Sequence, residues 1–153
     1  MTINTSPQGL LVSVDGTEFT APVNATWQVG SKHTLSTTTP QRQVPGVDYE
    51  SPTWSDGGAI SHTVTASPST TAYTVTFQAY YELTVAASPA AGGTVSPAIA
   101  TFYQAGSVVS IQASPKSGYT FKNWTGNVAK STSASTTVTM TAPETVTANF
   151  VKK

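Results

Sequence analysis

The sequence predicts an all-β protein made of two tandem repeats, each a small β-sandwich-like or β-grasp-like unit of about six short strands with essentially no helix. Thr and Ser together supply 46 of the 153 residues, and β-branched Thr suits the half-exposed surface of a pleated sheet. Aliphatic and aromatic residues recur at short intervals, but no window sustains an apolar period of 3.6 residues over ten positions. The two halves of the chain also resemble each other segment by segment.

Four pairs of matched segments define the repeat. They are "WQVGSKHTLSTTTP" (27–40) with "YQAGSVVSIQASP" (103–115), "YESPTW" (49–54) with "YTFKNW" (119–124), "HTVTAS" (62–67) with "TTVTMT" (136–141), and "AYTVTF" (72–77) with "TVTANF" (145–150). The openings "INTSP" (3–7) and "VAASP" (85–89) also agree. We therefore expect a first repeat over 1–79 and a second over 80–153. The joining stretch 74–85 contains no Gly or Pro, so it can run as one nearly continuous strand that restricts the orientation of the repeats.

In the second repeat, turn residues separate short runs of strand-forming residues. We expect strands over 81–87, 93–96, 107–113, 119–124, 135–140 and 145–151. Alternation places Val109, Ile111 and Ala113 on one face, and Val146, Ala148 and Phe150 on one face. We expect Tyr119, Phe121 and Trp124 to supply much of the core. Because Trp124 is out of phase with the other two aromatics, a bulge or bend is needed to turn all three inward.

The composition excludes several classes of function. Seven basic and seven acidic residues leave no net charge, so nothing favours binding to nucleic acid or to an anionic membrane. The absence of Cys excludes disulfides, thiol nucleophiles and thiolate metal sites. No signal peptide or membrane-spanning stretch is visible. We expect a monomeric piece of a longer exported chain, with no membrane insertion.

The stretch "SDGGAISH" (55–62) contains Ser, Asp and His, the residue types of a hydrolytic site. The matching stretch of the second repeat, 125–137, has neither an acidic residue nor a His. What both stretches keep is a Trp, a short polar residue, and then Gly or Asn, which is typical of a tight turn. We therefore predict a turn here, no catalytic residues, and a protein that is not an enzyme.

Metal and covalent sites find little support in the sequence. His33 and His62 are replaced by Val109 and Thr136 in the second repeat, and only Asp15, Asp48 and Asp56 could add carboxylates in the first. We expect no cofactor and no metal. The oxygen-rich loop 55–58 as a calcium site, and an internal crosslink through Lys116 or Lys122, remain alternatives.

Large aromatic residues are the candidates for ligand contact. Trp54 and Trp124 occupy equivalent places in the two repeats, so we expect both in the cores. The candidates for contact with a glycan are Trp27, Tyr80, Tyr81 and Tyr103, and of these we expect Trp27, Tyr80 and Tyr81 to be the more exposed. Exposure of Trp27, Tyr80 or Tyr81 on one flat face would favour a carbohydrate-binding module, and their burial would favour a spacer.

A set of residues spread over almost all of the second repeat forms a recognisable pattern: Gly92-Gly93-Thr94-Val95, Gly106, Gly118-Tyr119, Trp124, Gly126 and Val146 to Phe150. With this set, the second repeat resembles a divergent internalin-type B-repeat of bacterial surface and secreted proteins. The first repeat departs from this pattern. Its opening, 6–22, is similar to a PEGA-type β motif, and it carries a longer insert at 41–52 before its Trp.

The resemblance implies a non-catalytic module of an exported bacterial protein, located outside the cell or on its surface. Such modules stand in series as spacers, stalks or adhesive units, next to other domains of a longer chain. A cell-surface protein or a glycan is then the expected partner. The alternative function is a carbohydrate-binding module attached to a secreted enzyme.

Overall fold

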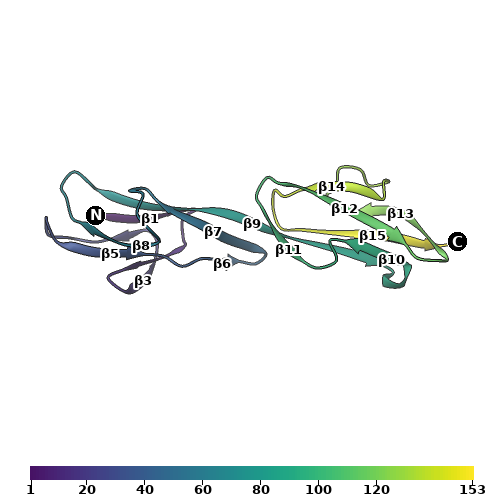
Figure 1. The fold of residues 1–153 in the computed structure, drawn as a ribbon, viewed down its shortest axis with the longest axis horizontal. Helices are drawn as coiled ribbons and strands as arrows, with labels where there is room; N and C mark the ends of the chain where they lie inside the picture. Colours follow the sequence, from purple (N-terminus) through teal and green to yellow (C-terminus); the bar gives the residue numbers. More distant parts are fainter. The chain divides into compact units, whose positions relative to one another are not determined.

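The computed structural model describes all 153 residues, and they form an all-β fold in which the one helical element is the 3₁₀ turn η1 (Ala90–Gly92) (Figure 1). The chain folds as two compact units. Unit 1 contains Met1–Gln43 and Asp48–Gln78, and unit 2 contains Val44–Val47 and Ala79–Lys153. The chain has no helix with the length and hydrophobicity needed to span a membrane.

Fifteen strands make up the two units, and β9 belongs to both. The strands of the first repeat are β1 (Thr2–Ser6), β2 (Leu11–Val14), β3 (Thr17–Thr20), β4 (Val23–Asn24), β5 (Lys32–Ser36), β6 (Gln41–Val44), β7 (Val47–Trp54), β8 (Ser61–Thr65) and β9 (Ala72–Ser88). After β9 come β10 (Gly93–Ser96), β11 (Thr101–Gln104), β12 (Val108–Pro115), β13 (Tyr119–Thr125), β14 (Ser135–Thr139) and β15 (Glu144–Lys152). The continuous strand predicted over 74–85 is thus confirmed.

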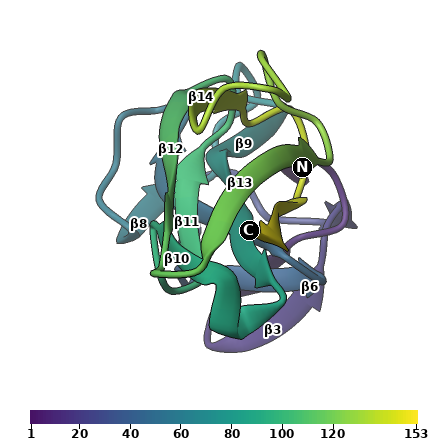
Figure 2. The ribbon, with the colours of Figure 1, turned by 90° about the vertical axis from the view of Figure 1, so that its right-hand side faces the viewer.

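Unit 2 is a β-sandwich. Strands β11, β9, β15 and β13 form one sheet, and the antiparallel sheet β10-β12-β14 forms the other (Figure 2). The inward residues predicted on β12 and β15 are all buried, together with Leu83, Val85, Val138 and Met140. Since the core lies between two sheets and no α-helix covers either one, the structure favours the sandwich over the β-grasp alternative.

Strand β13 contains the irregularity that its aromatic residues require. Its pairing with β15 shifts register between Phe121 and Asn123. Beyond this bulge Trp124 is buried, while Tyr119 and Phe121 are half-buried against the same core. The predicted bulge is therefore confirmed. It lets Trp124 face the same core as Tyr119 and Phe121, although strict alternation would place Trp124 on the opposite face of the strand.

Unit 1 repeats this architecture with the same strand registers. Its sheet β3-β2-β5-β8 pairs Leu35 with His62, and the matching strands of unit 2 pair Ile111 with Thr136. In each unit the opening strand runs parallel to the closing strand. β1 pairs with β9 through residues 2–6 and 72–76, and β9 pairs with β15 through residues 83–88 and 144–149.

The all-β fold class is confirmed, but each repeat contains more than about six strands. The strand β11 of the second repeat was not predicted from the sequence, and in the first repeat the insert 41–52 forms β6 and most of β7. The two-residue β4 and the four-residue β11 are too short to show an alternating pattern. They are strands because they pair with β1 and β9, so their existence depends on distant parts of the chain.

A close approach of the backbone explains the Gly pair that opens the B-repeat pattern. A Cβ atom at Gly92 would lie 2.6 Å from the Phe150 Cβ, and one at Gly93 would overlap the Phe150 ring. Because only a residue without a side chain fits there, this pair lets the buried Phe150 ring of β15 lie directly against the start of β10.

The two matched Trp residues are both in the cores, as predicted, with 4% of Trp54 and 2% of Trp124 exposed. Each indole Nε1–H donates to a backbone carbonyl in the loop that follows, Ile60 O at 3.2 Å and Ser133 O at 2.9 Å. Each Trp therefore fills its core and also holds a loop in place.

We expect Trp54→Ala and Trp124→Ala each to lower the free energy of unfolding by about 3–5 kcal/mol, because each leaves a cavity and an unpaired carbonyl. Urea denaturation followed by circular dichroism measures the loss. Phe19→Ala, at an exposed aromatic, is the control and should change stability by less than about 0.5 kcal/mol. A loss below about 1 kcal/mol for either Trp would show that it does not support its core.

Candidate functional site

The stretch 55–62 forms a turn, as predicted, with Gly57 at a φ of 75° and the Gly58 amide donating to Asp56 Oδ1. The structure nevertheless joins the Asp and the His of this stretch. His62 Nε2 lies 3.0 Å from Asp56 Oδ2, and His62 Nδ1 lies 2.8 Å from the Ala59 carbonyl. Ser55 Oγ instead accepts the Thr74 amide. Both ring nitrogens of His62 thus face acceptors, and neither is directed at a hydroxyl group that it could activate.

A second Asp–His pair, formed by Asp15 and His33, was not predicted from the sequence. His33 Nδ1 lies 2.7 Å from Asp15 Oδ2, and His33 Nε2 lies 2.8 Å from Ser31 Oγ. The His33 ring stacks on Trp27 with 4.1 Å between centroids and 6° between planes. Hydroxyl, imidazole and carboxylate therefore stand in the order of a nucleophilic triad. No sequence motif marks the group, because Asp15 reaches His33 only through the pairing of β2 with β5.

The surroundings of Ser31 point to a structural role. Its hydroxyl also lies 2.6 Å from the Gln28 carbonyl, and unit 2 has the same contact from Ser107 to Gln104 at 2.7 Å, where Val109 replaces the His. The amides of Gly30 and Ser31 are already used: Gly30 donates to Ala66 O and Ser31 donates to Gln28 O. They do not point into a shared space as oxyanion-binding groups would.

The three carboxylates that could have formed a metal site are each engaged by a different partner. Asp15 pairs with His33 and Asp56 with His62, while the buried Asp48 holds Arg42 through two bonds of 2.7 and 2.9 Å. The hydrogen bonding of Arg42 to Asp48, in which the guanidinium donates, raises the pKa of Arg42, and the negative charge of Asp48 is the next largest cause. No group of three His or acidic residues is close enough together to hold a metal ion.

The four aromatic candidates are divided between the two units. All four are half-buried, with Trp27 in unit 1 and Tyr80, Tyr81 and Tyr103 in unit 2. Trp27 packs against the core of its unit, and Tyr81 and Tyr103 sit opposite each other on β9 and β11 against the other core. Their role in ligand contact stays a prediction. The packing gives each of Trp27, Tyr81 and Tyr103 a structural role as well.

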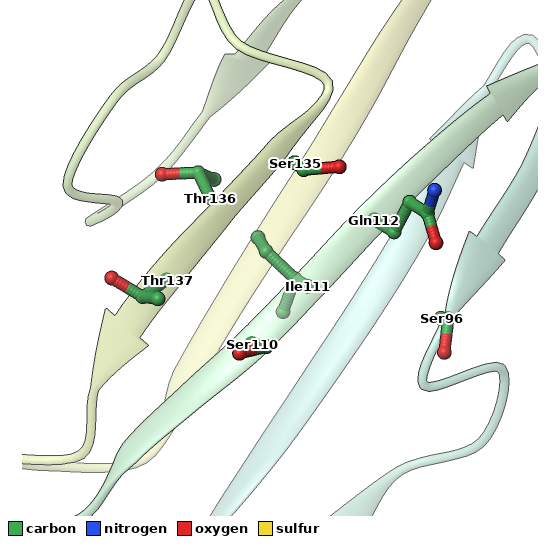
Figure 3. Close-up of a pocket in the computed structure, with 7 residues that line it drawn as sticks. All are labelled: Ser96, Ser110, Ile111, Gln112, Ser135, Thr136 and Thr137. Carbon is green, nitrogen blue, oxygen red and sulfur yellow. The ribbon is translucent and has the colours of Figure 1, made fainter.

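A polar pocket that was not predicted from the sequence lies on the sheet β10-β12-β14. It has a volume of about 420 Å³, and its lining residues are Ser96, Ser110, Ile111, Gln112, Ser135, Thr136 and Thr137 (Figure 3). One row across the three strands joins Ser96, Gln112 and Ser135. In unit 1 the corresponding row joins Ser13, Ser36 and Ser61. Each unit therefore presents a row of uncharged hydrogen-bonding side chains on equivalent strands.

The Asp15 carboxylate gives a testable pH dependence. The hydrogen bond from His33, followed by that from the Thr34 amide at 2.8 Å, lowers the pKa of Asp15. Its contribution to stability is therefore complete above the unfolded-state pKa and is lost as pH falls through the lower folded-state pKa. We expect Asp15→Asn, which tolerates the φ of 51° at this position, to flatten the fall in stability below about pH 4. Urea denaturation at a series of pH values measures this; parallel curves for both proteins would contradict it.

Comparison with known families supports the B-repeat pattern of the second repeat. A family model described as the divergent InlB B-repeat domain matches residues 83–153. Comparison with curated proteins and with solved structures gave no match. The family match does not extend to the first repeat, whose PEGA-like opening stays a prediction. Residues 83–153 thus match the divergent InlB B-repeat domain family, in agreement with the resemblance seen in the sequence of the second repeat.

Proposed function

We propose that this chain is a non-catalytic tandem module of an exported bacterial protein, which acts outside the cell as a spacer or stalk between other domains or as an adhesive unit. The match of the second repeat to a B-repeat family supports a repeat module of surface proteins. The recurrence of the same registers in unit 1 supports two modules in series.

The observation that carries the spacer role is the continuity of β9. This strand runs from Ala72 to Ser88 without Gly or Pro. Its first part pairs with β1 through 72–76, and its later part pairs with β15 through 83–88 and with β11 through 80–83. Only a few residues of the strand remain outside these ladders, so the connection has little of the freedom of a flexible linker.

Inserting Gly-Gly after Gln78 tests the spacer role. We expect the insertion to broaden the distribution of distances between a spin label at Thr26 and one at Thr120, measured by pulsed electron paramagnetic resonance, because it interrupts β9. The matched control is Gly-Gly after Thr132, in an exposed loop of unit 2, which should leave the distribution unchanged. An equally broad distribution in the parent chain and in the Gln78 insertion would contradict a stiff connection.

A second candidate function, binding of a neutral glycan, is favoured by the polar pocket of unit 2. Its lining combines hydroxyl groups with one amide and contains no charged side chain. Its volume of about 420 Å³ falls within the range of small-ligand sites. Hydroxyl and amide groups can both donate to and accept from sugar hydroxyls. This pocket, rather than the half-buried aromatic residues, is then the contact surface.

Affinity electrophoresis in gels that contain neutral polysaccharides tests the glycan role. If a polysaccharide retards the chain, Ser110→Ala combined with Gln112→Ala should weaken binding about thirtyfold, since two hydrogen bonds of about 1 kcal/mol each are removed. Thr120→Ala, on the exposed face of β13, is the control. Unchanged retardation of the double variant would place binding elsewhere, and no retardation by any neutral polysaccharide would contradict this second candidate.

A further inference from the structure

In unit 2, the strand β11 is fully covered on its β9 side. Thr101, Phe102, Tyr103 and Gln104 pair with Leu83, Glu82, Tyr81 and Tyr80 in antiparallel register. The ladder continues one step further, because the Ala105 amide donates to the Ala79 carbonyl at 2.8 Å. Residues 79–82 of β9 thus complete this edge of the sandwich by pairing with β11. They lie just before the part of β9 that pairs with β15.

Unit 1 has the same ladder in the same register, but only its first part is formed. Residues 25–28 correspond to 101–104 through the match of "WQVGS" with "YQAGS". β4 pairs with β1 at Asn24 and Val23, and Met1 and Ala25 exchange two hydrogen bonds of 3.0 and 2.9 Å. The ladder observed in unit 1 ends at this pair of Met1 and Ala25.

The backbone of residues 26–29, which follows the pair of Met1 and Ala25, can extend this ladder. In an antiparallel pair, residues that exchange hydrogen bonds recur at every second position, so after Ala25 they would fall at Trp27 and Val29. The structure shows no backbone hydrogen bond from Thr26, Trp27 or Val29. In unit 2 the equivalent positions are Tyr103 and Ala105, and both are paired.

The side chains beside this edge leave room for a partner. An open pocket of about 230 Å³ is lined by Met1, Trp27, Val29, Ala66, Ser67, Pro68, Thr70 and Thr71. Val29 is 67% exposed, and Trp27 has a stacking partner on one ring face, His33. In unit 2 the residue opposite the equivalent Tyr103 is Tyr81, which packs against the core. A strand aligned like 79–82 would place an aromatic side chain opposite Trp27.

We propose that residues 26–29 are a strand-acceptor edge, and that its occupant is the closing strand of another repeat of this kind, arranged head to tail before residue 1. The occupant would be an extended segment with the chemistry of 79–82, which is a small residue, two aromatic residues and an acidic one. This is recognition by strand addition: backbone pairing supplies affinity, and the aromatic residue opposite Trp27 supplies specificity. The proposal rests on the correspondence between the two units and not on the spacer or adhesive role.

The test is to place the segment Gln78–Glu82 directly before residue 1 of the full chain. Hydrogen exchange measured by NMR should then slow at least tenfold for the Trp27 and Val29 amides, because both become paired. Acrylamide quenching of Trp fluorescence should also fall, since Trp27 is the one Trp that is not buried. The amides of Tyr103 and Ala105, which are paired already, serve as the internal reference and should not change.

The matched control carries the same added segment with Pro in place of its second Tyr. Pro removes the amide that would donate to the Trp27 carbonyl, so exchange at Trp27 and Val29 should return to the rate of the parent chain. Slower exchange with the Tyr segment but not with the Pro segment supports the proposal. Unchanged exchange with the Tyr segment, or equal protection by both segments, overturns it, whatever the outcome of the linker and glycan experiments.

Discussion

Parallel pairing between the first and last strands of each repeat is the constraint on which the rest of the structure depends. In a parallel pair the chain enters at one end of the ladder and leaves at the other. β1 with β9, and β9 with β15, both obey this rule, and β9 is the closing strand of one unit and the opening strand of the next. A fold closed in this way can be joined in series without a loop. The remaining strands complete the two sheets around the opening and closing strands.

The two units solve the same packing problem with different chemistry. At the inward position of β12 unit 2 has Val109, and at the equivalent position of β5 unit 1 has His33. A His in this place needs hydrogen-bond partners, and Asp15 and Ser31 provide them. The other His is also half-buried, and it packs edge-on against Trp54 at 5.5 Å. The polar groups that resemble catalytic machinery are thus explained as the partners that two half-buried His residues require.

Features encoded within short stretches were predictable from the sequence. The two core Trp residues, the bulge before Trp124, the turn at Gly57 and the inward faces of β12 and β15 all follow from local pattern or from the internal match. Features created when distant segments meet were not. β4 and β11 carry no pattern of their own, the Asp15–His33–Ser31 contact depends on strand pairing, and the polar pocket is assembled from three strands.

The direction of the closing pair also determines how a unit responds to tension along the chain. Pulling residue 83 and residue 152 apart would slide β9 and β15 past each other, because the two strands run in the same direction. All hydrogen bonds from Glu144 to Asn149 would then bear the load together, whereas an antiparallel hairpin pulled from its open end separates one bond at a time. Shear loading of this kind raises the force at which a domain unfolds without requiring a larger free energy of unfolding. This strand order thus raises the resistance of each unit to tension without requiring a larger hydrophobic core.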